Sequence, residues 1–152
     1  LETPKQLRPA LDCAFGFSDQ VIVEEYIKGR EITVGILGDQ ALPVVEIVPK
    51  QRFFNFQAKY EQGQSDYIVP AKLSKSYYQR AQSMGLLAHN CLGCRGFSRI
   101  DMILNGKRPY VLEVNSIPGL TARSLLPMAA RAKGIGFAQL CLKIIKLSLG
   151  RI

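Results

Sequence analysis

The sequence predicts an α+β fold, with a largely antiparallel sheet and flanking helices. Two apolar runs at 29–37 and 41–48 have strand character, and only the short turn "GDQ" separates them. Connections this short join antiparallel strands, because a parallel crossover needs a dozen or more residues. Apolar residues then recur at helical spacing over 74–91 and again after residue 124, which predicts helices that cover the sheet.

The length and composition predict one globular domain. The chain has 152 residues, of which 47% are hydrophobic. No apolar stretch approaches the roughly 20 residues that span a bilayer, and the first residues lack the pattern of a signal peptide. We therefore expect a soluble, cytoplasmic protein without membrane contact. The chain begins without methionine and in the middle of a pattern, so we expect a piece of a longer protein.

The net charge of +8 does not by itself predict a nucleic-acid partner. The 20 Lys and Arg residues are scattered along the chain, and no run of five basic residues occurs. Tyr and Phe do not alternate with the basic residues, as they would on a surface that stacks bases. The charge pattern favours a solvated basic surface, and we expect no nucleic acid as a partner.

The four cysteines do not predict a metal site. "CLGC" at 91–94 has the spacing of half a zinc site, but a tetrahedral site needs four ligands. Cys13 and Cys141 are isolated in apolar surroundings, so the second pair is missing. We interpret Cys91 and Cys94 as small buried hydrophobic residues. An absence of disulfides fits the cytosol.

The first third of the chain reads as a helix followed by three strands. Residues 4–17 predict a short helix, 18–20 a turn, and the apolar run "VIVEEYI" at 21–27 a strand. The strands 29–37 and 41–48 follow, so the simplest arrangement is an antiparallel meander.

Residues 50–66 show no helical period and are long for a connection inside a compact domain. Such loops are usually functional or disordered. The chain then predicts a helix from Ser74 to Cys91, ended by Gly93, and strands at 94–104 and 109–115 around "NGKR". A loop rich in Pro and Gly, "SIPGLTARS", leads to two further helices at 124–134 and 137–150.

The last predicted strand carries two oxygen-bearing side chains on one face. Glu113 and Asn115 are two residues apart, so they share a face of the sheet. Asp101, on the preceding strand, joins that face only if an odd number of residues connects the strands. "NG" favours a two-residue turn, which gives the wrong parity, whereas Pro109 resists strand pairing. We therefore predict a five-residue connection and a shared face.

Two carboxylates and an amide at one place predict a site for a hard cation such as Mg²⁺. Arg99 lies two residues before Asp101, on the same face, where its guanidinium could meet a phosphoryl oxygen. A structural network in which Arg99 only neutralises Asp101 and Glu113 is the alternative, and spacing does not decide between the two.

A fuller set of motifs resembles a known family, the D-alanine–D-alanine ligases of the ATP-grasp superfamily. The matching stretches are "VEEYIKGREITVGILG", "ALPVVEIVPK", "FFNFQAKY", "LGCRGFSRID" and "LEVNSIPGLTARSLLPMAA". The resemblance implies that 1–20 are a remnant of the central ATP-grasp subdomain and that 21–152 are the C-terminal ATP-grasp domain. It also implies that the N-terminal domain and most of the central one are absent.

The resemblance implies a role for each matching residue. Glu24, Glu25, Ile27 and Glu31 would contact the nucleotide, although Glu31 alone reads as a solvated strand carboxylate. Asp101, Glu113 and Asn115 would bind the metal. Arg99 and Lys59 would stabilise the transferred phosphoryl group, with Tyr60 near the substrates on a loop that closes over the site. Gly119, Ser124 and Leu125 would bind the second D-alanine, although Ser124 alone reads as a helix N-cap.

The implied function is ATP-dependent ligation of two D-alanines through an acyl phosphate, for peptidoglycan precursors. Implied cofactors are ATP and Mg²⁺, with Mn²⁺ as a substitute, and the full-length enzyme would be a homodimer. The glycine-rich phosphate loop of the family is missing here, so we expect the isolated chain to be inactive. Arg123 replaces the histidine that is more usual, which leaves the acceptor open. Another ATP-grasp carboxylate–amine ligase and a non-catalytic nucleotide-binding module are the alternatives.

Overall fold

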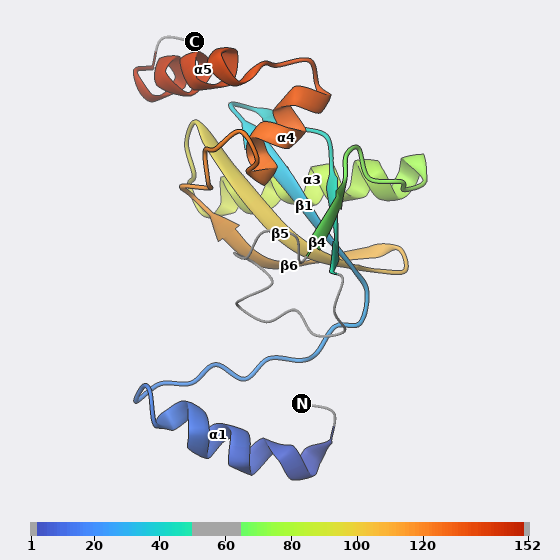
Figure 1. Cartoon of the computed structure of the whole chain (residues 1–152), viewed down its shortest axis with the longest axis vertical. Helices are drawn as coiled ribbons and strands as arrows, with labels where there is room; N and C mark the ends of the chain where they lie inside the picture. Colours follow the sequence, from blue (N-terminus) through green and yellow to red (C-terminus); the bar gives the residue numbers. More distant parts are fainter. Residues whose placement is uncertain (1–2, 50–64, 151–152) are drawn as a thin grey trace.

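A computed structural model describes residues 3–49 and 65–150 and confirms the predicted α+β class (Figure 1). Its single sheet has the order β4-β3-β1-β5-β6, with the short β2 paired to β1, and every pairing is antiparallel. The strands are β1 (Arg30–Leu37), β2 (Gln40–Ala41), β3 (Val45–Pro49), β4 (Ser65–Ile68), β5 (Phe97–Asn105) and β6 (Arg108–Asn115). The helices are η1 (Pro4–Gln6), α1 (Leu7–Phe15), α3 (Lys75–Cys91), α4 (Leu125–Ala132) and α5 (Phe137–Ser148).

Two apolar layers bury the central strand β1 on both sides. Alternate residues Ile32, Val34 and Ile36 belong to a core beneath α3, which also takes Ile100 and Met102 from β5. Leu37 belongs to a second core beneath α4 and α5. β1 is therefore buried on both faces from Ile32 to Leu37, although Glu31 and Thr33 make its second face partly polar.

The segment 21–27 was predicted as a strand, and that prediction is wrong. The backbone there is extended but pairs with no strand that the structure describes. Ile22 and Tyr26 expose 85% and 82% of their surface. Figure 1 shows this segment running away from the sheet to α1, a helix without buried residues. An apolar run becomes a strand only where a neighbouring strand accepts its backbone hydrogen bonds.

The hairpin of β5 and β6 differs from its prediction in a way that matters for the site. Asn105 pairs with Arg108, so the connection has two residues, not the five predicted. The register then shifts, since Met102 pairs with Val111 but Asp101 pairs with Glu113. This β-bulge, with Leu112 as the extra residue, restores the parity that the short turn would have broken.

Pro109 does not prevent the short turn. Pro109 lies on β6, which is an edge strand of the described sheet, and it pairs with Leu104 of β5. A proline is tolerated in an edge strand, where its missing N–H can face outward. Gly106, with φ of 55°, takes the first position of the two-residue turn, where the chain needs a positive φ. The dipeptide signal was therefore the stronger of the two.

Cys91 and Cys94 were predicted to be buried, and this is also wrong. Cys13 and Cys91 are exposed, Cys94 and Cys141 are partly exposed, and all four are free thiols. Within residues 3–49 and 65–150, no group of three or more His, Cys, Asp and Glu side chains is arranged to hold a metal. No helix in the described ranges is long and apolar enough to cross a membrane.

A buried histidine makes the stability depend on pH. His89, the only histidine, is 3% exposed, and its Nδ1 shares a 2.6 Å hydrogen bond with the Ser98 hydroxyl. Burial lowers the pKa of His89 below its ordinary value of 6.5. Between the two pKa values the unfolded chain binds more protons than the folded one. The histidine's contribution is therefore complete above about pH 6.5 and is lost as the pH falls through the folded-state pKa.

We predict that His89→Gln removes this part of the pH dependence. Urea unfolding of the wild type and the variant at several values from about pH 5.5 to 7.5 measures it. The wild type should lose stability relative to the variant as the pH falls. A difference between the two proteins that stays constant over this range would contradict the prediction.

Close packing of β1 against α4 gives a second prediction. A Cβ on Gly35 would lie 2.5 Å from Leu126 Cδ1 and 3.1 Å from Leu42 Cδ1. Gly35→Ala should therefore destabilise the fold by about 1–3 kcal/mol, and Leu126→Ala by about 2–5 kcal/mol. The double variant should lose at least about 0.5 kcal/mol less than the sum, because the new methyl group fills space that the leucine vacates.

Urea unfolding of the four proteins gives this coupling energy. Gly136→Ala is the matched control, because a Cβ there meets nothing within 4 Å. Its effect should add to that of Leu126→Ala without coupling. Strict additivity of Gly35→Ala with Leu126→Ala would show that β1 and α4 do not pack in this way.

Candidate functional site

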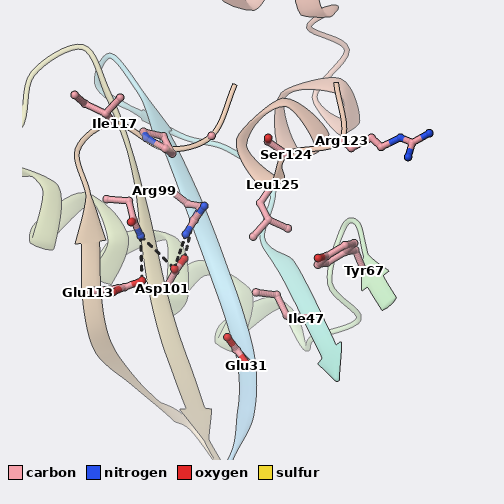
Figure 2. Close-up of a pocket in the computed structure, with 13 residues that line it drawn as sticks. Glu31, Ile47, Tyr67, Arg99, Asp101, Glu113, Ile117, Arg123, Ser124 and Leu125 are labelled. Carbon is pink, nitrogen blue, oxygen red and sulfur yellow. Dashed lines mark hydrogen bonds and ion pairs between the residues drawn. The ribbon is translucent and has the colours of Figure 1, made fainter. Parts of the chain in front are cut away.

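A cavity of about 420 Å³ opens on the face of the sheet that α4 borders (Figure 2). β1, β5 and β6 supply Glu31, Arg99, Asp101 and Glu113, β3 and β4 supply one apolar and one aromatic side chain, and the loop before α4 adds Arg123 and closes one end. The lining residues are Glu31, Ile47, Tyr67, Arg99, Asp101, Glu113, Asn115, Ile117, Pro118, Gly119, Arg123, Ser124 and Leu125.

Asp101 is the most heavily bonded side chain of the cavity, and it is only 4% exposed. Arg99 donates from Nε to Asp101 Oδ1 at 2.9 Å and from Nη2 to Oδ2 at 2.8 Å. The Thr33 hydroxyl lies 2.7 Å from Oδ1, and Asn115 Nδ2 donates to Oδ2 at 3.2 Å. Both oxygens of this carboxylate therefore accept two hydrogen bonds each.

The pKa of Asp101 lies below its ordinary value. Burial by itself raises the pKa, because it disfavours the charged form. The hydrogen bonds and the positive charge of Arg99, together with the Thr33 hydroxyl, outweigh burial. Asp101 is therefore an ionised, buried carboxylate at neutral pH.

Glu113 lies beside Asp101, as its register partner across the hairpin. Asn115 Nδ2 donates to Glu113 Oε1 at 3.3 Å as well as to Asp101, so the amide lies between the two carboxylates. This geometry confirms the prediction that Asp101, Glu113 and Asn115 share one concavity, with Arg99 beside them.

The ion-pair alternative is also present, because Arg99 is paired with Asp101 in this structure. The Arg99 side chain is 18% exposed and lines the cavity. A guanidinium that lines a cavity can also face an anion there. Pairing with Asp101 and contact with an anionic ligand are therefore compatible.

The donor set fits a hard divalent cation bound together with an anion. Asp101, Glu113 and Asn115 supply carboxylate and amide oxygens, which Mg²⁺ and Mn²⁺ prefer. Rotation of the Asn115 amide by half a turn would present its oxygen in place of its nitrogen. Arg99 adds positive charge beside these side chains, whereas Arg123 also lines the cavity but points its guanidinium away from them in Figure 2.

The end of the cavity next to α4 carries the predicted acceptor residues Gly119, Ser124 and Leu125. Ser124 holds the N-cap position of α4, but its hydroxyl makes no cap hydrogen bond. It accepts instead from the Thr121 backbone N–H at 3.1 Å and lies 2.9 Å from the Thr121 hydroxyl. A Cβ on Gly119 would lie 3.0 Å from Ser124 Oγ, so a larger residue there would require Ser124 to shift.

The structure does not bring all predicted residues together. Glu31 lines the cavity, at the far end from Ile117 in Figure 2. Glu24, Glu25 and Ile27 lie on the extended segment before β1 and do not line it. The predicted residues Lys59 and Tyr60 lie outside the described residues.

Several residues of the site were not predicted, among them Thr33, Ile47 and Tyr67. Thr33 lies two residues after Glu31 on β1, so strand alternation was a signal that could have found it. Tyr67 belongs to β4, a four-residue strand with polar residues that the sequence reading missed. It pairs with Ile47 of β3, so the two form one wall of the cavity.

Known proteins resemble the chain over nearly its whole length. A family model described as "D-ala D-ala ligase C-terminus" matches residues 1–146. The D-alanine–D-alanine ligase of Trichlorobacter lovleyi is 47% identical over 92% of this chain and 45% of its own length. That of Geobacter sulfurreducens is 44% identical over 95% of this chain and 46% of its own. The chain thus spans about half the length of these curated relatives.

Solved structures agree with this result. The D-alanine–D-alanine ligase of Bacillus anthracis complexed with ATP has a TM-score of 0.83 and 32% identity, covering 97% of this chain and 47% of that one. The VanG D-Ala:D-Ser ligase of Enterococcus faecalis has a TM-score of 0.80 and 32% identity, covering 95% and 43%. On the family match, this chain belongs to the D-alanine–D-alanine ligase C-terminal family.

Proposed function

We propose that this chain supplies the cation site, part of the nucleotide site and the acceptor site of an ATP-dependent ligase that joins two D-alanines. One observation carries the proposal. Two carboxylates, an amide and a guanidinium converge in the same cavity as the N-terminus of α4. The named relatives and the ATP-complexed neighbour support this function, and the family resemblance implies a role in peptidoglycan precursor synthesis.

Asp101, Glu113 and Asn115 would hold Mg²⁺, with Mn²⁺ as a substitute. Such a cation supplies positive charge beside the phosphate oxygens. Arg99 adds a fixed positive charge on the same side, where negative charge develops on the transferred phosphoryl group. Lys59 and Tyr60 are proposed partners on the strength of the resemblance alone.

The nucleotide would extend from this cation site toward Glu31. A carboxylate at that end of the cavity can accept hydrogen bonds from ribose hydroxyls. The same proposal assigns Glu24, Glu25 and Ile27 to the base. They precede β1 directly, so a change in the path of residues 21–29 would suffice to bring them near Glu31.

The acceptor D-alanine would bind at the start of α4. The first turn of a helix presents backbone N–H groups without partners inside the helix, and these favour a carboxylate. Leu125 begins α4, and the Ser124 hydroxyl and Gly119 border the same end of the cavity. Arg123 adds a positive charge to this end.

In the proposed reaction, a carboxylate oxygen of one D-alanine attacks the γ-phosphorus of ATP, and ADP leaves. The amine of the second D-alanine then attacks the acyl phosphate carbon, inorganic phosphate leaves, and the amine nitrogen loses a proton. The chain's own residues position the reactants and stabilise negative charge, as in other phosphoryl transfers. Dimerisation and the cytoplasmic location stay predictions.

A different acceptor is the second candidate. Arg123 departs from the residue expected at this position, and VanG, a D-Ala:D-Ser ligase, has the same fold. Another ATP-grasp carboxylate–amine ligase would keep the cation site and change the α4 end of the cavity. The acceptor amine must therefore be varied in any test of activity.

We predict that a chimera is an active ligase. Residues 1–146 of this chain would replace the matching half of the Trichlorobacter lovleyi ligase. ADP release should depend on D-alanine, and D-alanyl-D-alanine should form. Glu113→Gln in the chimera should lower kcat more than about a hundredfold, since the loss of a direct ligand exceeds the effect of an outer one.

D-serine and other amines as acceptors separate the two candidates. ADP release that follows another amine instead of D-alanine would replace the proposed acceptor. A folded chimera that binds ATP without any amine-dependent turnover would favour the non-catalytic module.

We further predict that this chain binds Mn²⁺ at the same carboxylates. Glu113→Gln should weaken Mn²⁺ binding about tenfold or more, and excess Mg²⁺ should displace the ion. Free Mn²⁺, measured by electron paramagnetic resonance, reports the affinity. Asp39→Asn is the matched control, because Asp39 is exposed on the turn between β1 and β2 and should leave the affinity unchanged. Equal affinities of the wild type and Glu113→Gln would place the ion elsewhere.

A further inference from the structure

Thr33 contacts Asp101 of the candidate cation site from the neighbouring strand β1. It pairs with Asp101 across β1 and β5 and is 1% exposed. Its hydroxyl oxygen lies 2.7 Å from Asp101 Oδ1 and 3.0 Å from the Ile100 carbonyl oxygen. A hydroxyl has one proton, and a bond to an ionised carboxylate is the stronger one. The Thr33 hydroxyl therefore donates to Asp101.

The donors around Asp101 differ in what else they can reach. A carboxylate offers about four acceptor positions, and Arg99, Asn115 and Thr33 fill four at Asp101. Arg99 and Asn115 line the cavity, so a ligand there can attract their side chains. Thr33 does not line it. Its bond to Oδ1 is therefore the one that a ligand in the cavity cannot reach directly.

Retention of that bond has a geometric consequence. Because the Thr33 hydroxyl holds Oδ1, the Asp101 carboxylate keeps its Oδ2 on the side of Asn115. The Asn115 amide also donates to Glu113. Oδ2 and Glu113 Oε1 then stay within reach of one small ligand. Outer hydrogen-bond partners of this kind orient ligating carboxylates and tune their affinity for a cation.

We infer that Thr33 is a positioning residue of the cation site, which fixes the orientation of the Asp101 carboxylate without touching the ligand. This inference rests on the function proposed above. Thr33→Val keeps the shape of the side chain and removes the hydroxyl, whereas Thr33→Ser keeps the hydroxyl. Thr33→Val should weaken Mn²⁺ binding about tenfold or more, and Thr33→Ser should restore most of the affinity.

The control separates positioning from general destabilisation. Ser98 is also a fully buried hydroxyl on β5, but it bonds to His89 beneath α3, away from the cavity. Ser98→Ala should lower the stability of the fold and leave the Mn²⁺ affinity unchanged. A second readout needs no metal, since three-bond scalar couplings measured by NMR report the χ1 angle of Asp101. They should indicate one rotamer in the wild type and Thr33→Ser and rotamer averaging in Thr33→Val.

The two readouts distinguish the possible failures. Unchanged couplings in Thr33→Val would overturn the inference, whatever the Mn²⁺ affinity. An Mn²⁺ affinity of Thr33→Val equal to that of the wild type, while Glu113→Gln binds more weakly, would also overturn it. Rotamer averaging in Thr33→Val with no Mn²⁺ binding to the wild type would refute the proposed cation site and support only the orientation of Asp101 by Thr33.

Discussion

The pairing of Asp101 with Glu113 across the β5–β6 hairpin is the constraint on which the site depends. It exists because one extra residue, Leu112, is accommodated between two regular stretches of the ladder. Without that bulge, Leu112 would lie opposite Asp101, and Glu113 would point into the core beneath α3. A carboxylate there would have to lie among apolar side chains, at a cost of several kcal/mol. The bulge thus keeps the Glu113 carboxylate out of the apolar core and directs it into the cavity.

Two neighbouring carboxylates in a half-buried cavity repel each other, so they need nearby positive charge and hydrogen-bond donors. Two strands of the sheet supply these partners. Arg99 comes from the same strand as Asp101, and Thr33 comes from the adjacent strand β1. β1 is the most buried strand, held by α3 on one face and by α4 on the other. Thr33, the partner that a ligand in the cavity cannot reach, therefore lies on the most buried strand, which suits a residue that orients Asp101.

The sequence predicted the elements with strong periodicity and missed those set by long-range pairing. Helix α3 and the strands β1, β5 and β6 were predicted because their apolar residues repeat over many positions. The segment 21–27 has equal strand propensity but finds no partner, and β4 has weak propensity but pairs with β3. For the candidate site, the faces on which its side chains lie were predictable, since strand alternation fixes them. The bulge at Leu112 was not, because no residue type marks it.

The predicted loop length was wrong, but it still placed Asp101 and Glu113 on the same face of the sheet, because that outcome can be set at two different places in the hairpin. A five-residue connection and a two-residue turn with one bulge both place Asp101 and Glu113 on one face. The two arrangements differ in how far the extra residues lie from the site. A longer loop at Gly106 would set the position of Glu113 from five or more residues away, through a strand at the edge of the sheet. The bulge sets it at the neighbouring residue, so fluctuations of the hairpin tip need not reach the carboxylates. A tight turn at Gly106 and a bulge beside Glu113 therefore define the face of the candidate cation site more locally than the predicted loop would.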